Sequence, residues 1–150
     1  MNEYWCSSLI ACHKFLKSNK FLPHENIEIP ISKTFTDIRP WVKYGWEMVL
    51  ITHEIIKRNN SLNHANKDKF LENYEENCRR ILSKNSWHPQ TLQSYLDSSR
   101  KLQISSNFDK WVSLHKPFLE VIEFIKQAAS EKIKIGIIST KGKLFTSKIV

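Results

Sequence analysis

The residues best suited to chemistry lie near the carboxyl end of the chain, where Ser139, Thr140 and Lys141 follow a short apolar run. A strand that ends in hydroxyl side chains at the start of a helix can bind phosphate, because the hydroxyls and the free amides of the first helical turn point past the strand end. Lys141 would add positive charge there. The same pattern is also typical of a strand-to-helix turn in which the hydroxyl only caps the helix. Both interpretations remain open from the residues alone.

Other chemistry is excluded by composition and spacing. The chain has only three glycines, so it contains neither a dinucleotide-binding Gly-x-Gly-x-x-Gly motif nor a P-loop. Its six histidines and three cysteines show no zinc-ligand spacing. No metal site is therefore predicted.

The elements that must position these residues are mainly helical. A length of 150 residues with 41% hydrophobic residues is the size of one domain with a core of its own. Apolar residues recur at three- and four-residue spacing in several segments, which predicts helices there. These helices are expected over residues 3–18, 38–58, 67–84, 89–104 and 117–130. Residues 21–33, with Pro23 and Pro30, are expected to form an extended connector.

One segment favours a strand. Residues 133–138 are rich in isoleucine, with the density of a buried parallel strand. A single buried strand would leave backbone groups unpaired at about 1–3 kcal/mol each, so it should lie beside other strands. The expected fold class is therefore mainly α, with a helical bundle plus a partial α/β core that has one clear strand and an unfilled edge. We interpret the chain as part of a larger fold.

The order of these elements resembles a known family. Lys116-Pro117-Phe118-Leu119-Glu120-Val121, a helix, and then Ile135-Gly136-Ile137-Ile138-Ser139-Thr140-Lys141-Gly142 are similar to the approach to the second motif of the haloacid dehalogenase (HAD) superfamily. In that family the strand ends in a Ser or Thr that binds the transferred phosphate, often with a Lys within two residues. The resemblance implies that Ser139, Thr140 and Lys141 bind phosphate. Leu119-Glu120 departs from the Pro-Gly that is common there.

The resemblance also covers the preceding helices. HAD phosphatases of one type insert a cap of about four helices before this segment, and Met1–Trp5 and Arg39–Met48 are similar to poorly characterised HAD proteins. This implies a helical cap-like region at residues 1–115 and a partial Rossmann-like HAD core at residues 116–150. Within the cap, Arg39, Lys43 and Tyr44 would contact substrate. The alternative is that the two cations are simply solvated.

The catalytic parts of the family are missing. The chain has no Asp-x-Asp motif, which supplies the nucleophile and its acid/base partner, and the later lysine and acidic pair would follow Val150. We expect a fragment of a HAD-type hydrolase, from a broken reading frame or a misplaced start, without catalytic residues of its own. The Mg²⁺ of the complete family is not expected to bind this chain, which should be inactive as a phosphatase.

The charge balance bears on the partner. The formal net charge of +8 favours phosphorylated, nucleic-acid or membrane-surface partners. The lysines are spread among acidic residues and no arginine-rich recognition helix is present, so nucleic acid is the less favoured partner. A phosphorylated small molecule is the partner that the resemblance implies. The alternatives are a basic helical nucleic-acid-binding module and a helical scaffold without chemistry.

Location and association follow from the remaining patterns. No apolar run reaches the roughly 18–20 residues that a membrane span needs, and no secretory signal precedes the first helix. An odd number of cysteines in such a chain favours reduced thiols, so a cytoplasmic location is expected. Apolar surface left uncovered by the missing sheet predicts self-association.

Overall fold

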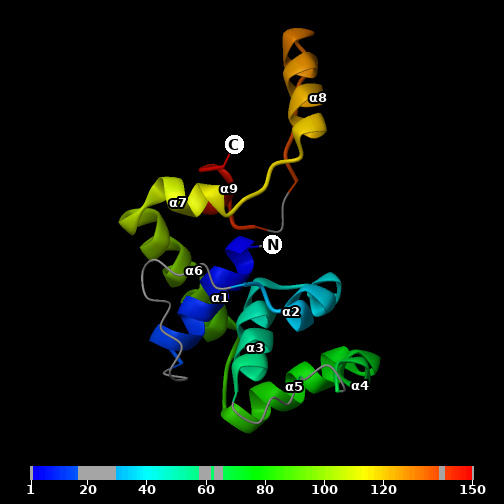
Figure 1. Cartoon of the computed structure of the whole chain (residues 1–150), viewed down its shortest axis with the longest axis vertical. Coiled ribbons are helices and arrows are strands. Elements are labelled where there is room, and N and C mark those ends of the chain that lie inside the picture. The colour runs from blue at the N-terminus through cyan, green and yellow to red at the C-terminus, as the bar shows by residue number, and fades with distance from the viewer. Residues whose placement is uncertain (1, 17–29, 58–61, 63–65, 139–140, 150) are drawn as a thin grey trace.

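The structure, a computed structural model, describes residues 2–16, 30–57, 62, 66–138 and 141–149. Their secondary structure is helical, and the helices follow one another along the chain as a series of long and short segments (Figure 1). They are α1 (Asn2–Lys14), α2 (Lys33–Ile38), the 3-10 turn η1 (Arg39–Trp41), α3 (Gly45–Ile56), α4 (Lys67–Glu72), α5 (Tyr74–Asn85), α6 (Pro89–Ser106), α7 (Phe108–Ser113), α8 (Leu119–Ser130) and α9 (Lys143–Thr146).

The predicted fold class is wrong in its α/β part. No strand occurs in the described ranges, and residues 133–138, the predicted strand, form an extended segment without a pairing strand. The isoleucines of this segment are exposed, and Ile138 is fully so. A strand needs a neighbour to pair its backbone groups, and the described helices offer none. An apolar run by itself therefore did not produce a sheet.

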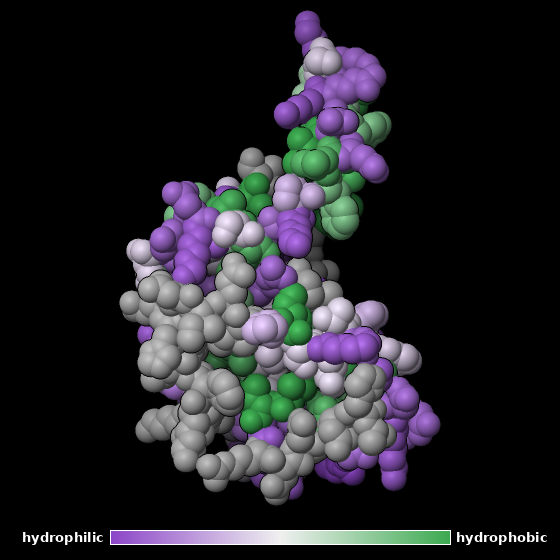
Figure 2. Space-filling model, in the orientation of Figure 1, coloured by the Kyte–Doolittle hydropathy of each residue, from purple (hydrophilic) through white to green (hydrophobic). Residues whose placement is uncertain are grey.

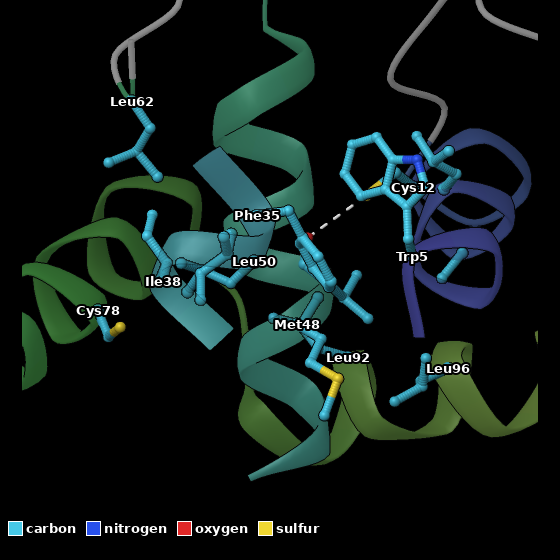
Figure 3. Packing of buried hydrophobic residues seen from close by; sticks show 14 of the residues in the cluster. Trp5, Cys12, Phe35, Ile38, Met48, Leu50, Leu62, Cys78, Leu92 and Leu96 are labelled. Atoms are coloured by element: carbon cyan, nitrogen blue, oxygen red, sulfur yellow. Dashed lines mark hydrogen bonds between the residues drawn. The ribbon is translucent and has the colours of Figure 1, made fainter. Parts of the chain in front are cut away.

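The core lies where α1, α3 and α6 pack against one another (Figure 3). Helices α1 and α6 each bury one side, whereas α3 is buried over consecutive residues from Glu47 to Glu54, so α3 is the central helix of the three. The most deeply buried members of this interior include Trp5, Leu9, Cys12, Val49, Leu50, Leu92 and Leu96. The Cys12 thiol also donates to the Val49 carbonyl at 3.3 Å, so it ties α1 to α3.

Two predicted helices are confirmed with small shifts of their ends. The helix expected over 89–104 is α6, and the one expected over 117–130 is α8. Pro89 occupies the first turn of α6, where its missing N–H costs no hydrogen bond. Local signals were sufficient here because both helices are long and strongly periodic.

The other three predicted helices differ from the structure. The chain expected to be one helix over 67–84 is divided at Asn73 into α4 and α5. The helix expected from residue 38 begins only at Gly45, because the backbone is extended at Val42 after the 3-10 turn. The helix expected over 3–18 ends at Lys14. Residues 21–29 of the expected connector lie outside the described residues.

The end of α5 gives a first testable prediction. Ser86 has a φ of 53°, while Trp87 N–H donates to the Leu82 carbonyl and Ser86 N–H to the Ser83 carbonyl. This is a Schellman ending, whose left-handed position normally carries glycine. Ser86→Gly should raise the free energy of unfolding by about 0.5–1 kcal/mol, because a non-glycine residue is strained there. Urea unfolding would measure it.

The matched control is Ser86→Ala, which keeps a Cβ atom at the strained position. Ser86 is exposed and its side chain makes no hydrogen bond to the described residues, so neither change removes a contact. The alanine variant should gain nothing. Equal or lower stability of the glycine variant relative to the natural chain would contradict the account of this turn.

Helix α8 projects away from the other helices, and the extended segment after it returns toward them (Figure 1). Most of its residues are exposed, unlike those of α1, α3 and α6. Across the described ranges, no helix has both the length and the apolar character required to cross a bilayer.

Candidate functional site

Three cations from separate parts of the chain surround the ring of Tyr4. The Lys141 Nζ lies 4.9 Å from the ring centroid, the Arg39 Cζ 5.0 Å and the Arg100 Cζ 5.4 Å. These distances are within the range of a cation–π interaction. Glu3 pairs with Arg100 and Lys141, and His115 lies next to both Glu3 and Lys141. We define the Tyr4 cluster as Tyr4, the three cations and these two residues: Glu3, Tyr4, Arg39, Arg100, His115 and Lys141.

The pattern of α6 explains why a cation enters the interior. Leu92, Leu96 and Ser99 are buried on one side of this helix, and Arg100 continues that side by one residue. The helix spacing of 3.6 residues therefore carries the guanidinium against α1 rather than into solvent. Glu3 lies in the first turn of α1, where a carboxylate is also favoured by the helix dipole.

Glu3 is the carboxylate at the centre of the Tyr4 cluster. Its Oε1 accepts from Arg100 Nε at 2.8 Å and from Ser7 Oγ at 2.9 Å, and its Oε2 accepts from Lys141 Nζ at 2.7 Å. Burial raises the pKa of Glu3, but attraction to Arg100 and Lys141 outweighs it and lowers the pKa to about 2. Glu3 is therefore ionised under all ordinary conditions.

The cationic side of the cluster is tightly packed. The side chain of Lys141 is only 8% exposed, and its Nζ lies 3.2 Å from His115 Nε2 as well as next to Glu3. Burial lowers the pKa of Lys141, and the attraction of Glu3 offsets only part of this effect. Burial and the nearby Lys141 charge also lower the pKa of His115. At neutral pH the imidazole is therefore neutral.

Arg39 differs from the other two cations. It is half-buried in η1 and forms no ion pair with the part of the chain that the structure describes. Arg100, by contrast, is bound to Glu3 and also approaches Asp97 at 3.5 Å. Arg39 therefore keeps its guanidinium donors available to a ligand. A guanidinium presents them in a fork that matches phosphate or carboxylate oxygens.

Aromatic groups form the surroundings of these charges. Trp111 is buried, its ring lies 5.6 Å from Lys141 Nζ, and its edge meets the His115 ring at a centroid distance of 4.6 Å. Phe145 covers the Arg100 guanidinium at 5.3 Å. The indole N–H of Trp111 has no hydrogen-bond acceptor among the described residues. A buried donor left without an acceptor is costly.

The structure brings together only some of the residues that the sequence predicts. Lys141 and Arg39 both belong to the Tyr4 cluster. Lys43 does not, because its Nζ pairs with Glu75, and Tyr44 is exposed and stacks against Trp46 at 6.4 Å.

Two further residues of the predicted phosphate site, Ser139 and Thr140, lie outside the described residues. Their contribution to phosphate binding stays a prediction.

Sequence reasoning did not find Glu3, Arg100 or His115. Glu3 and Arg100 are separated by 97 positions and Glu3 and Lys141 by 138, so no local motif connects them. One signal was present for Arg100, since it falls on the apolar side of a periodic helix. A charge at such a position indicates a buried partner.

The donors do not fit a divalent metal. No group of three or more His, Cys, Asp or Glu side chains within the described ranges is placed to hold a metal ion. Both oxygens of Glu3 already accept from cations. A hard cation such as Mg²⁺ requires several oxygen ligands and would be repelled by the surrounding arginines and lysine.

No family model, curated protein or solved structure matches this chain.

Proposed function

We propose that the chain binds the phosphate group of a phosphorylated small molecule at the Tyr4 cluster. The observation that carries this proposal is the convergence of Arg39, Arg100 and Lys141 on one ring, with a single buried carboxylate, Glu3, between them. Arg100 and Lys141 share one carboxylate and Arg39 has no ion pair with the described residues, so positive charge is left uncompensated. An anion with two charges and several acceptor oxygens is suited to such a site.

The residues divide into two roles. Arg100 and Lys141 hold Glu3, so they fix the geometry and contribute long-range attraction. Arg39 supplies the available donors, because its guanidinium lies over the Tyr4 ring and has no ion pair with the described residues. Asp97 offsets part of the charge of Arg100, but its side chain is 37% exposed and the pair is 3.5 Å long. Solvent therefore weakens that compensation.

The HAD resemblance supports the same ligand. It assigns phosphate binding to Lys141 and substrate contact to Arg39, two residues that lie at the same ring. We do not assign catalysis, because phosphoryl transfer of that type needs an aspartate pair that is absent from the sequence. All three cysteines are thiols, which agrees with a cytoplasmic location for this activity.

A matched pair of variants tests the site. Arg39→Gln and Lys43→Gln each remove one positive charge, but only Arg39 lies at the Tyr4 ring. We expect Arg39→Gln to weaken binding of inorganic phosphate and of a phosphate monoester about tenfold, because a charge-assisted hydrogen bond is lost. Lys43→Gln should change the affinity little. Amide chemical shifts followed during titration of the full chain would give both dissociation constants.

Two results would contradict the proposal. Equal weakening by both variants would indicate general attraction to a basic protein rather than a site. Shifts confined to residues far from Tyr4, Arg100 and Lys141, such as the α4–α5 region, would place the ligand elsewhere. Comparison with chloride at the same ionic strength separates phosphate recognition from screening.

A further inference from the structure

An arm made by residues 118–138 leaves the body of the protein and presents apolar side chains to solvent (Figure 2). Figure 2 shows these side chains on the projecting part of the molecule together with charged ones. The exposed apolar members are Phe118, Leu119, Val121, Phe124, Ile125, Ile133, Ile135, Ile137 and Ile138. A contiguous surface of this kind is typical of an interaction site.

The end of α8 sets the direction of the second half of the arm. Lys132 has a φ of 60°, Ile133 N–H donates to the Ala128 carbonyl at 3.0 Å, and Lys132 N–H donates to the Ala129 carbonyl at 3.0 Å. This ending turns the chain sharply, so residues 133–138 run back toward the body along the arm (Figure 1). Because the helix ends sharply at this turn, residues 133–138 form one extended segment.

The backbone of this segment is available for pairing. From residue 134 to residue 138, the N–H and C=O groups make no hydrogen bond to the described residues. An extended, exposed segment of alternating isoleucines is a template for a second strand. The position of Gly136 is open, since a Cβ atom there would meet nothing within 4 Å.

We propose that the partner strand is the same segment of a second copy of this chain, paired antiparallel about Ile135. In this register Ile135 faces its own copy, Ile133 faces Ile137, and Lys134 faces Gly136. The isoleucines at 133, 135 and 137 of both copies then share one face of the pair. No lysine lies opposite a lysine.

The sequence disfavours the parallel alternative. In a parallel, in-register pair, Lys132 and Lys134 would each lie beside their own copies, and adjacent like charges destabilise strand pairs. The antiparallel pair instead places Lys134 beside a glycine, which leaves space for its aliphatic stem. Self-complementarity of this kind is the reason for choosing a second copy over an unrelated strand.

The charges of the whole arm agree with this orientation. The end of the arm near the body carries two carboxylates, Glu120 and Glu123. The half of the arm beyond Glu123 carries three lysines, Lys126, Lys132 and Lys134, and the carboxylate of Glu131. An antiparallel pair brings the basic end of one arm beside the acidic end of the other. The net charge of +8 on each chain opposes association, and the opposite charges brought together on the two arms offset part of that repulsion.

Sedimentation velocity of the full chain tests the pairing. Ile135→Lys places two lysines at the symmetry point and removes two buried isoleucines, so we expect the dimer dissociation constant to rise about a hundredfold. Leu144→Lys is the control, because Leu144 is an exposed apolar residue outside the arm. It should leave the dimer unchanged.

Disulfide cross-linking tests the register. Ile135→Cys should form a covalent dimer readily, whereas Ile138→Cys should not, because the two copies of residue 138 would lie roughly 20 Å apart in the antiparallel pair. The natural chain gives the background from its own three thiols. Equal cross-linking at both positions would indicate parallel pairing and overturn the proposal. A monomer at every concentration tested, or a dimer unaffected by Ile135→Lys, would also overturn it.

Discussion

Glu3→Gln should lower the free energy of unfolding by about 3–5 kcal/mol, the loss typical of a buried ion pair deprived of one partner. The side chains of Glu3 and Arg100 are 2% and 4% exposed, so water cannot replace the missing carboxylate. Lys141 loses the same partner and is 8% exposed. Two buried cations would remain beside each other without their common anion. Urea unfolding of the natural chain and the variant gives the difference.

Asp97→Asn is the matched control for Glu3→Gln. It removes a carboxylate that approaches the same Arg100, but at 3.5 Å and on a side chain that is 37% exposed. We expect a loss of less than about 1 kcal/mol, because solvent screens this pair. A loss for Glu3→Gln as small as that for Asp97→Asn would show that the Tyr4 cluster contributes little to stability.

Acid should destabilise the protein through the same carboxylate. The pKa of Glu3 is about 2 in the folded chain and its ordinary value is 4.5. Because folding depresses this pKa, the stabilisation is complete above pH 4.5 and is lost as the pH falls from 4.5 through 2. Linkage gives a loss of about 3 kcal/mol over that range. Free energies of unfolding measured at several pH values would trace it.

The Glu3→Gln variant serves as the reference for the pH series. It has no carboxylate at position 3 to take up a proton, so its stability should depend less steeply on pH between 4.5 and 2. Other carboxylates, such as Asp37 and Glu75, also have lowered pKa values but lie on the surface and remain in both proteins. Parallel pH profiles for the two proteins would show that Glu3 is not the group responsible.

Local patterns predicted the long helices but not their arrangement. The helix α6 was predicted nearly to its ends because proline starts it and apolar residues recur along it. The division at Asn73 could not be foreseen, since Phe70 and Tyr74 continue an apolar periodicity across it. The isoleucine density of residues 133–138 predicts a strand that the structure does not form. Strand formation depends on a neighbour, which composition does not provide.

Local patterns also predicted only part of the candidate site. Lys141 and Arg39 were singled out from short motifs, and both lie at the Tyr4 ring. Their common partner, Glu3, carried no local signal because its contacts are to distant residues. Burial of a charge is decided by tertiary packing, and only a structure reveals which opposite charge accompanies it.

The contact between Glu3 and Lys141, which spans 138 positions, also bears on the order of assembly during synthesis. The residues of α1, α3 and α6 all precede residue 141 in the chain, so the core and the Arg100 contact with one oxygen of Glu3 can form before the lysine is released from the ribosome. The contact of Glu3 Oε2 with Lys141 Nζ can form only after residue 141 has been added. Chains that end after α6 but before residue 141 should therefore hold a bundle that is already packed yet more easily opened than the full chain.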